Sequence, residues 1–235
     1  NYNSLKTILN RARENARGVQ DHITKEVWEQ VNQSYHAVNQ NTLEESLYGY
    51  DVMNVLESFS RQTLLYTGVT DITMPRGLGW SFMNLGKYVE RCMETIVMTD
   101  KQFEQIDYNP ENTKDIIEWR YLLLCLSGYE LHLKTYRTTA YNNNVLHQVL
   151  FNEDFTRSVI YSLSRIDKYL KDVVSEFNSP ERAALLRSFG RLYSKVQYMD
   201  RDGLNNLTLQ EFLAEIKDGL LNFSKQLGQS FFSYS

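Results

Sequence analysis

Hydrophobic residues recur with helical spacing along almost the whole chain, and this feature constrains the fold more than any other. In the first segment, Leu5, Ile8, Leu9, Ala12 and Ala16 follow the i, i+3, i+4, i+7 spacing of one helix face. The same spacing predicts eight further helices, over residues 24–35, 51–66, 80–104, 113–137, 142–150, 155–177, 181–199 and 208–232. Thr24 is expected to be the N-cap of the first of these eight. The pattern therefore predicts an all-α fold, a single-domain bundle of about eight to nine amphipathic helices over residues 1–235.

Turn-forming residues are scarce, which favours long elements. Eleven glycines and three prolines occur in 235 residues, about half the usual share of these two types. The clearest loop runs over residues 70–79 and contains Pro75, Gly77 and Gly79, while Gly68 is expected to close the helix before it. Because composition does not shift along the chain, one domain is preferred over two.

Composition and charge exclude several classes of protein. Hydrophobic residues make up 42% of the chain, enough for a sizeable core, and no apolar run approaches the ~18 residues that a membrane span needs. A net charge of −4 argues against a nucleic-acid or anionic-membrane binder. Cys92 and Cys125 lie in apolar helical stretches, which predicts buried, reduced thiols in a cytoplasmic protein.

The segment from Asp200 to Glu211 has the acidic spacing of a calcium loop. Leu204, however, has no side-chain oxygen at the fifth position, and Asn205 replaces the glycine needed at the sixth. Thr208-x-x-Glu211 is better explained as a capping box that opens the last helix. We therefore expect no metal and no cofactor, and we interpret the histidines as surface or capping residues: His22, His36, His132 and His147.

Glu130 is the most unusual carboxylate, because the predicted helix places it on the apolar face with Trp119 and Leu126. A charge buried there is costly unless it is paired or protonated. One interpretation is a carboxylate with a raised pKa at the floor of a cleft. The other is a buried ion pair with an arginine, for which the candidates are Arg91, Arg137 and Arg157.

The first helix carries a polar stripe beside its apolar face. Lys6, Arg13 and Arg17 form the basic part, and Glu14 points away from the apolar residues. Such a pattern is typical of a solvated face held by i, i+3 and i, i+4 pairs such as Glu14–Arg17, each worth about 0.2–0.5 kcal/mol.

Two predicted helix starts carry groups suited to an anion. Arg76 lies in the loop before the helix that starts near Trp80, and Arg157 with Ser158 lies in the first turn of the helix over 155–177. Free N–H groups at a helix start suit a carboxylate or phosphate, although every helix start has them. The loop lacks the Gly-Lys-Ser/Thr ending of a P-loop.

Several short motifs occur together in an order typical of one family. They are Ala12-Arg-Glu-Asn-Ala-Arg17, Ile23-Thr-Lys-Glu-Val-Trp-Glu-Gln-Val-Asn32, Gly79-Trp-Ser-Phe82, Leu85-Gly-Lys-Tyr-Val-Glu-Arg91 and Thr156-Arg-Ser-Val159. Over essentially its whole length the chain resembles the bacterial Alpha-E domain family, which is all-helical. The resemblance implies two partners, a circularly permuted ATP-grasp protein and a transglutaminase-like protease. It also implies a setting of ATP-dependent amide-bond formation on a peptide or small metabolite.

The chain departs from this family at three places. Family members usually begin with a helix bearing Gly-Arg-x-x-Glu-Arg-Ala-Glu, which the segment 85–91 echoes, so an N-terminal piece of about 70 residues is expected to be missing. Lys87 stands where the family prefers Arg, and Thr156 replaces a Pro. If the missing copy forms one wall of a cleft, we expect the fragment to be able to form a homodimer there.

Motif positions that packing does not explain are predicted to form one interhelical polar cluster. They are Arg13, Glu14, Arg17, Glu26, Glu90, Arg91, Glu130, Arg157 and Ser158, and Arg76 is added as an anion-binding candidate. The preferred function is a non-catalytic or substrate-presenting helical partner of the ATP-grasp system. The alternative is an enzyme of amide or ester chemistry with Glu130 or Glu90 as general base. The alternative requires these carboxylates to line an open pocket.

Overall fold

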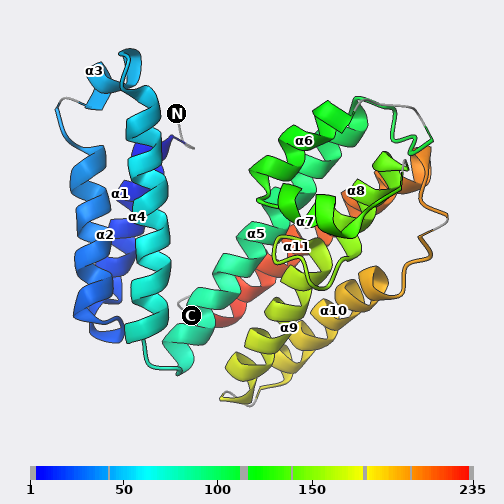
Figure 1. The fold of residues 1–235 in the computed structure, drawn as a ribbon. Coiled ribbons are helices and arrows are strands. Elements are labelled where there is room, and N and C mark those ends of the chain that lie inside the picture. The colour runs from blue at the N-terminus through cyan, green and yellow to red at the C-terminus, as the bar shows by residue number, and fades with distance from the viewer. Residues whose placement is uncertain are drawn as a thin grey trace. The chain divides into compact units, whose positions relative to one another are not determined.

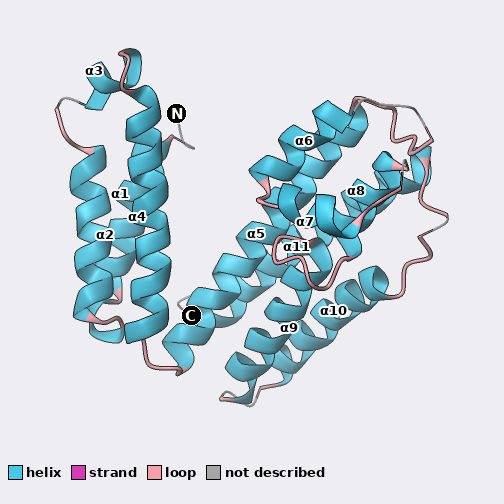
Figure 2. Cartoon of the chain, viewed as in Figure 1, coloured by secondary structure: helices cyan, strands magenta, loops and turns pink. Residues whose placement is uncertain are grey.

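The computed structural model confirms the all-α prediction (Figures 1 and 2). It describes residues 4–41, 43–111, 116–138, 140–176, 179–201 and 203–232. Within these residues there are eleven α-helices, a single 3-10 turn over Gln20–His22, and no strand. The helix count exceeds the predicted eight to nine because one expected helix is divided and a short helix was not predicted.

The chain divides into two compact units, Asn1–Trp80 and Ser81–Ser235. The first unit contains four helices: α1 (Leu5–Gly18), α2 (Lys25–Val38), α3 (Leu43–Tyr48) and α4 (Val52–Thr73). The second contains the rest: α5 (Leu78–Glu104, which begins at the end of the first unit), α6 (Ile116–Cys125), α7 (Tyr129–Thr135), α8 (Tyr141–Phe151), α9 (Val159–Ser175), α10 (Pro180–Gln197) and α11 (Asn206–Phe231). The prediction of a single domain stays a prediction, since compactness does not show whether either unit folds alone.

In the first unit, α2 packs against both α1 and α4. Side-chain caps fix where two of these helices begin. Ser4 Oγ accepts a hydrogen bond from the Thr7 backbone N–H at 3.2 Å, and Thr24 Oγ1 accepts one from the Val27 N–H at 3.4 Å. Thr24 is thus the N-cap that the sequence predicted.

In the second unit, α9 packs against α8 and α10, and α10 also packs against α11. Its core contains the large residues that periodicity placed on apolar faces, among them Trp119, Phe103 and Leu163, all fully buried. The rings of Phe103 and Trp119 lie 4.8 Å apart, and Trp119 Nε1 donates to Asn142 Oδ1 at 2.6 Å. The indole therefore buries its apolar surface and satisfies its one donor.

The helix predicted over residues 113–137 is broken at Ser127 and Gly128. α6 ends at Cys125, Ser127 adopts φ 56°, and the Gly128 N–H donates to the Leu123 carbonyl at 2.7 Å. A Cβ on Gly128 would come within 2.6 Å of Phe155 Cζ, so only glycine fits this close approach. Because α7 starts with a new helical phase, facing positions extrapolated from α6 do not hold in α7.

Three other sequence expectations are corrected. α4 continues through Gly68 to Thr73, because the open, helical backbone at Gly68 gives no reason to stop. The last helix begins at Asn206, so Thr208 is its third residue, where its Oγ1 accepts a hydrogen bond from the Asn205 N–H. Cys92 is buried as predicted, but Cys125, at the end of α6, is exposed.

Nothing in the described helices is both long and apolar enough to cross a membrane. Asp202, in the segment that imitates a calcium loop, lies outside the described residues. Among the residues that are described, no group of three His, Cys, Asp or Glu side chains is arranged to hold a metal ion.

Candidate functional site

Arginines and tyrosines from α5 and α9 gather on one face of the second unit. We call the arginine–tyrosine cluster the set Tyr88, Arg91, Arg157, Tyr161, Arg165 and Tyr169. The Tyr88 ring stacks on Tyr169 at 6.0 Å between centroids and lies 6.2 Å from Tyr161. The Arg91 guanidinium lies 5.6 Å from the Tyr88 ring, and that of Arg165 lies 4.8 Å from Tyr161. Both distances are within the range of cation–π attraction.

The start of α9 is fixed against α5 by hydrogen bonds. Ser158 is the fully buried N-cap: its Oγ accepts from the Tyr161 N–H at 3.1 Å and donates to the Asn152 carbonyl at 2.7 Å. From α5, Thr95 Oγ1 donates to the Arg157 carbonyl at 2.8 Å. These bonds hold the backbone of Arg157 beside Arg91, so their positive charges are brought together by the fold.

The three arginines of the cluster have no ion-pair partner among the residues that the structure describes. No described carboxylate oxygen lies within 4.0 Å of Arg91, Arg157 or Arg165. In addition, Nε of Arg165 is buried and has no hydrogen-bond acceptor in the part of the chain that is described. A buried donor without an acceptor costs about 1–3 kcal/mol, and more when it belongs to a charged group.

The accumulation of positive charge is visible in the pKa values. Burial, and then the nearby Arg91 charge, lower the pKa of Arg157. Burial raises the pKa of Tyr88, and Tyr161 and Tyr169 raise it further, while Arg91 and Arg165 act in the opposite direction. The cluster is thus a partly desolvated cationic surface whose charge is not balanced by an ion pair with any described carboxylate.

The residues predicted for the first helix act within the first unit. Arg13 lies between α1 and α2, where its Nε donates to Asn32 Oδ1 at 2.8 Å and its guanidinium lies 4.5 Å from the Tyr35 ring. Glu14 pairs with Arg13 at 3.1 Å and with Arg17 at 3.9 Å, which confirms the predicted Glu14–Arg17 pair. These groups satisfy one another and explain how α1 is held on α2.

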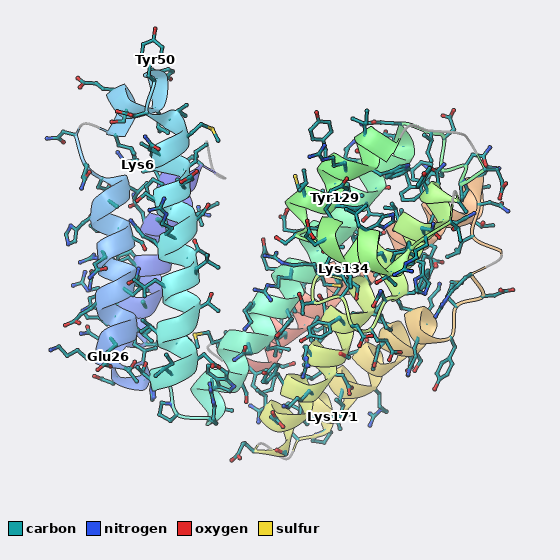
Figure 3. All side chains as sticks on the ribbon, viewed as in Figure 1. Lys6, Glu26, Tyr50, Tyr129, Lys134 and Lys171 are labelled. Atoms are coloured by element: carbon teal, nitrogen blue, oxygen red, sulfur yellow. The ribbon has the colours of Figure 1, made fainter. Side chains whose placement is uncertain are left out.

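Two further predicted residues also belong to the first unit. Arg76 donates to the Asp71 carbonyl and carboxylate at 2.6 and 2.9 Å, and its guanidinium lies 3.7 Å from the Trp80 ring. It therefore fixes the turn between α4 and α5 through the two hydrogen bonds of its Nη2 and its contact with the Trp80 ring. Glu26, in the first turn of α2, is exposed (Figure 3).

The prediction for Glu130 is wrong. Its side chain is 81% exposed, and its nearest charge is Lys134 at 4.0 Å, one turn further along α7. The error follows from the break at Ser127 and Gly128, which shifts the helical phase. Lys134 is labelled in Figure 3 on α7. Glu90 is also exposed, on the side of α5 away from the buried Cys92 and Tyr88.

The predicted convergence of these segments on one cleft stays a prediction, but two of the segments meet within the second unit. Arg91, Arg157 and Ser158 come together in the second unit, whereas Glu130 takes its own local partner. The sequence patterns did not identify Tyr88, Tyr161, Arg165 and Tyr169. The last three could have been found, because they follow at intervals of four within one predicted helix and so lie along one of its faces.

Two histidines differ from the surface positions predicted for them. His132 is buried, with Nδ1 2.8 Å from Gln148 Oε1, and His147 is half-buried, with Nδ1 2.6 Å from the Tyr136 hydroxyl. The positions of both histidines depend on how α7 packs against α8, which the hydrophobic pattern of the sequence does not show.

Comparison with known proteins agrees with the motifs. The chain matches, over residues 1–232, the model of the Alpha-E family, described as a predicted alpha-helical domain with a conserved ER motif. The chain belongs to the Alpha-E family. The Glu-Arg pair in the segment that resembles the family motif is Glu90–Arg91, and its arginine lies in the arginine–tyrosine cluster. No curated protein and no solved structure gives a significant match.

Proposed function

We propose that this Alpha-E chain is a non-catalytic helical module that binds an acidic segment of an ATP-grasp amide ligase. The observation that carries the proposal is the arginine–tyrosine cluster, in which three arginines lack a carboxylate partner among the described residues. An acidic partner would supply the missing charge, and arginine and tyrosine are both enriched among the residues that contribute most to binding energy in interfaces.

The choice of an ATP-grasp ligase rests on the resemblance to the Alpha-E family. The alternative, amide or ester chemistry with Glu90 or Glu130 as general base, gains no support from their positions. A general base needs hydrogen-bond reach to a bound substrate, and a raised pKa needs burial or a like charge. Both side chains are exposed, and neither lines the pocket beside α8.

The experiment is a binding titration between the purified chain and a circularly permuted ATP-grasp protein, the partner that the family resemblance implies. The Arg91→Gln and Arg165→Gln double variant removes both charges without introducing new ones. We expect the affinity to fall more than about tenfold and the salt dependence to weaken, because partly buried interfacial charges are lost.

The matched control is Arg187→Gln, which removes an exposed arginine of α10. It should leave the affinity unchanged, and circular dichroism should show the same helix content in all variants. Failure of the parent chain to bind at low salt, or equal affinity of parent and double variant, would overturn the proposal.

A further inference from the structure

A second polar site lies in the second unit, between α8 and the segment that joins α10 to α11. It is a pocket with a volume of about 610 Å³, within the ~300–1,000 Å³ range of small-molecule sites. Phe151, Leu146 and Leu204 give it an apolar part. Its polar lining includes Tyr136, His147, Arg201 and Glu111. No residue of the arginine–tyrosine cluster lines it.

A chain of hydrogen bonds sets the orientation of the groups in this pocket. Asn152 Oδ1 accepts from the Asp154 and Phe155 N–H groups at 2.9 and 3.1 Å, which fixes its amide. Asn152 Nδ2 therefore faces Tyr136 and donates to the Tyr136 oxygen at 3.1 Å. The Tyr136 hydroxyl has one proton, and its donor is used when this proton points to His147 Nδ1, 2.6 Å away, while the oxygen accepts from Asn152.

In this arrangement the tautomer of His147 is defined. Nδ1 accepts the hydrogen bond from Tyr136, so the single proton of the neutral ring is on Nε2. Burial, and then the Arg201 charge, lower the pKa of His147, which keeps the ring neutral. Nε2–H has no acceptor among the residues that the structure describes, and it is the donor left for a ligand.

Arg201 supplies the second donor group. Its guanidinium lies 5.2 Å from the Phe151 ring, and no described carboxylate lies within ion-pair distance of it. An arginine fork held against an aromatic ring is suited to a planar, two-oxygen anion. Glu111 lines the same pocket, and its negative charge favours a ligand that also carries an ammonium group.

We infer that this pocket binds a small zwitterion with a carboxylate group, such as a short peptide, and that Arg201 and His147 hold the carboxylate. The phenyl ring of Phe151 and the leucines offer apolar contact for the ligand's side chain. The inference is independent of the proposed partner binding, since the two sites share no residue.

The test uses the full chain and the dipeptide alanylphenylalanine as probe, followed through the His147 ring signals in NMR spectra. We expect the dipeptide to shift these signals, and we expect Arg201→Gln to weaken binding about tenfold or more, the loss of one charge-assisted contact. Arg187→Gln serves as the control and should bind like the parent. The ¹⁵N signals of His147 should show Nε2 protonated and Nδ1 unprotonated.

Two further probes separate the ligand classes. The C-terminal amide of the same dipeptide lacks the carboxylate and should bind at least about tenfold more weakly. Inorganic phosphate lacks the ammonium and apolar parts and should also bind more weakly. The inference is overturned if the dipeptide causes no shift, if Arg201→Gln binds it like the parent, or if the amide or phosphate binds as tightly.

Discussion

Both units of this chain show helical periodicity in sequence, but they bury the apolar faces of their helices to very different extents. In the described part of the first unit, the buried hydrophobic residues are Val27, Val38 and Met74, and α1 has no buried residue. On α4, five large hydrophobic residues are exposed: Met53, Leu56, Leu64, Leu65 and Ile72. In the second unit, a continuous buried cluster runs from α5 to α11.

Amphipathic spacing therefore predicts a helix, but it does not predict whether other elements cover the apolar stripe of that helix. Hydrophobic stabilisation follows the area removed from water, so equal patterns give unequal stability when one unit leaves its stripe open. We therefore expect the second unit to hold most of the stability, and the substitutions below compare matched positions in the two units.

The largest difference is expected between two leucines in the middle of long helices. Leu163 in α9 is fully buried, whereas Leu64 in α4 is 72% exposed. Leu163→Ala should lower the free energy of unfolding by about 2–5 kcal/mol, and Leu64→Ala should change it by less than about 0.5 kcal/mol. Urea unfolding followed by circular dichroism measures both. Similar losses in the two variants would show that α4 is covered in solution.

The next effect concerns the break between α6 and α7. In Gly128→Ala, the new methyl group would lie 2.6 Å from Phe155 and 2.7 Å from Gln148 Nε2, which donates to the Gly128 carbonyl. We expect a loss of about 1–3 kcal/mol from overpacking. Thermal unfolding measures this loss of stability. The NMR signals of His132, which is hydrogen-bonded to Gln148, should shift as well. An unchanged melting temperature would contradict the close packing at this turn.

The same break shows what could be predicted from sequence and what could not. Periodicity and capping residues such as Thr24 correctly gave an all-helical chain, because both are local properties. Ser127 and Gly128 interrupt a helix without a proline, since the packing of Phe155 and Gln148 from distant sequence fixes the turn. One local error was then enough to place Glu130 on the wrong face.

The residues of the candidate site were also predicted only in part from the sequence. Arg91, Arg157 and Ser158 were identified through the family motifs, but the helix was predicted to start at Phe155, whereas Ser158 is the N-cap and α9 begins at Val159. Tyr88 lies among the apolar residues of its predicted helix, so the pattern does not distinguish it from a core residue. The pocket residue Arg201 lies after the end of α10, where helical periodicity gives no information. Their roles depend on which helices pack together, and this is decided by tertiary contacts.

A smaller effect is expected from two helix caps, one in each unit. Ser158 is fully buried and both accepts and donates, whereas Ser4 is half-buried and caps the less buried α1. Ser158→Ala should cost about 1–2 kcal/mol, because the Tyr161 N–H and the Asn152 carbonyl both lose a partner. Ser4→Ala should cost about 0.5 kcal/mol. Chemical denaturation of both variants tests the ranking, and a larger loss for Ser4→Ala would reverse the comparison.

The smallest expected change in the free energy of unfolding is an increase. Gly68 lies inside α4, and a Cβ built on it has no atom within 4 Å apart from the helix's own backbone. Gly68→Ala should raise the free energy of unfolding by about 0.4–1 kcal/mol, because alanine restricts the unfolded chain and loses nothing in the folded one.

Gly128→Ala is the control for this last change, since the same substitution there should destabilise. Differential scanning calorimetry of the two variants shows whether Gly68→Ala raises the melting temperature and Gly128→Ala lowers it. A loss of stability in Gly68→Ala would mean that another surface packs against this part of α4 in solution. The exposed hydrophobic residues of α4 would then belong to an interface, and the contrast between the two units would have to be drawn for the assembled protein instead of the single chain.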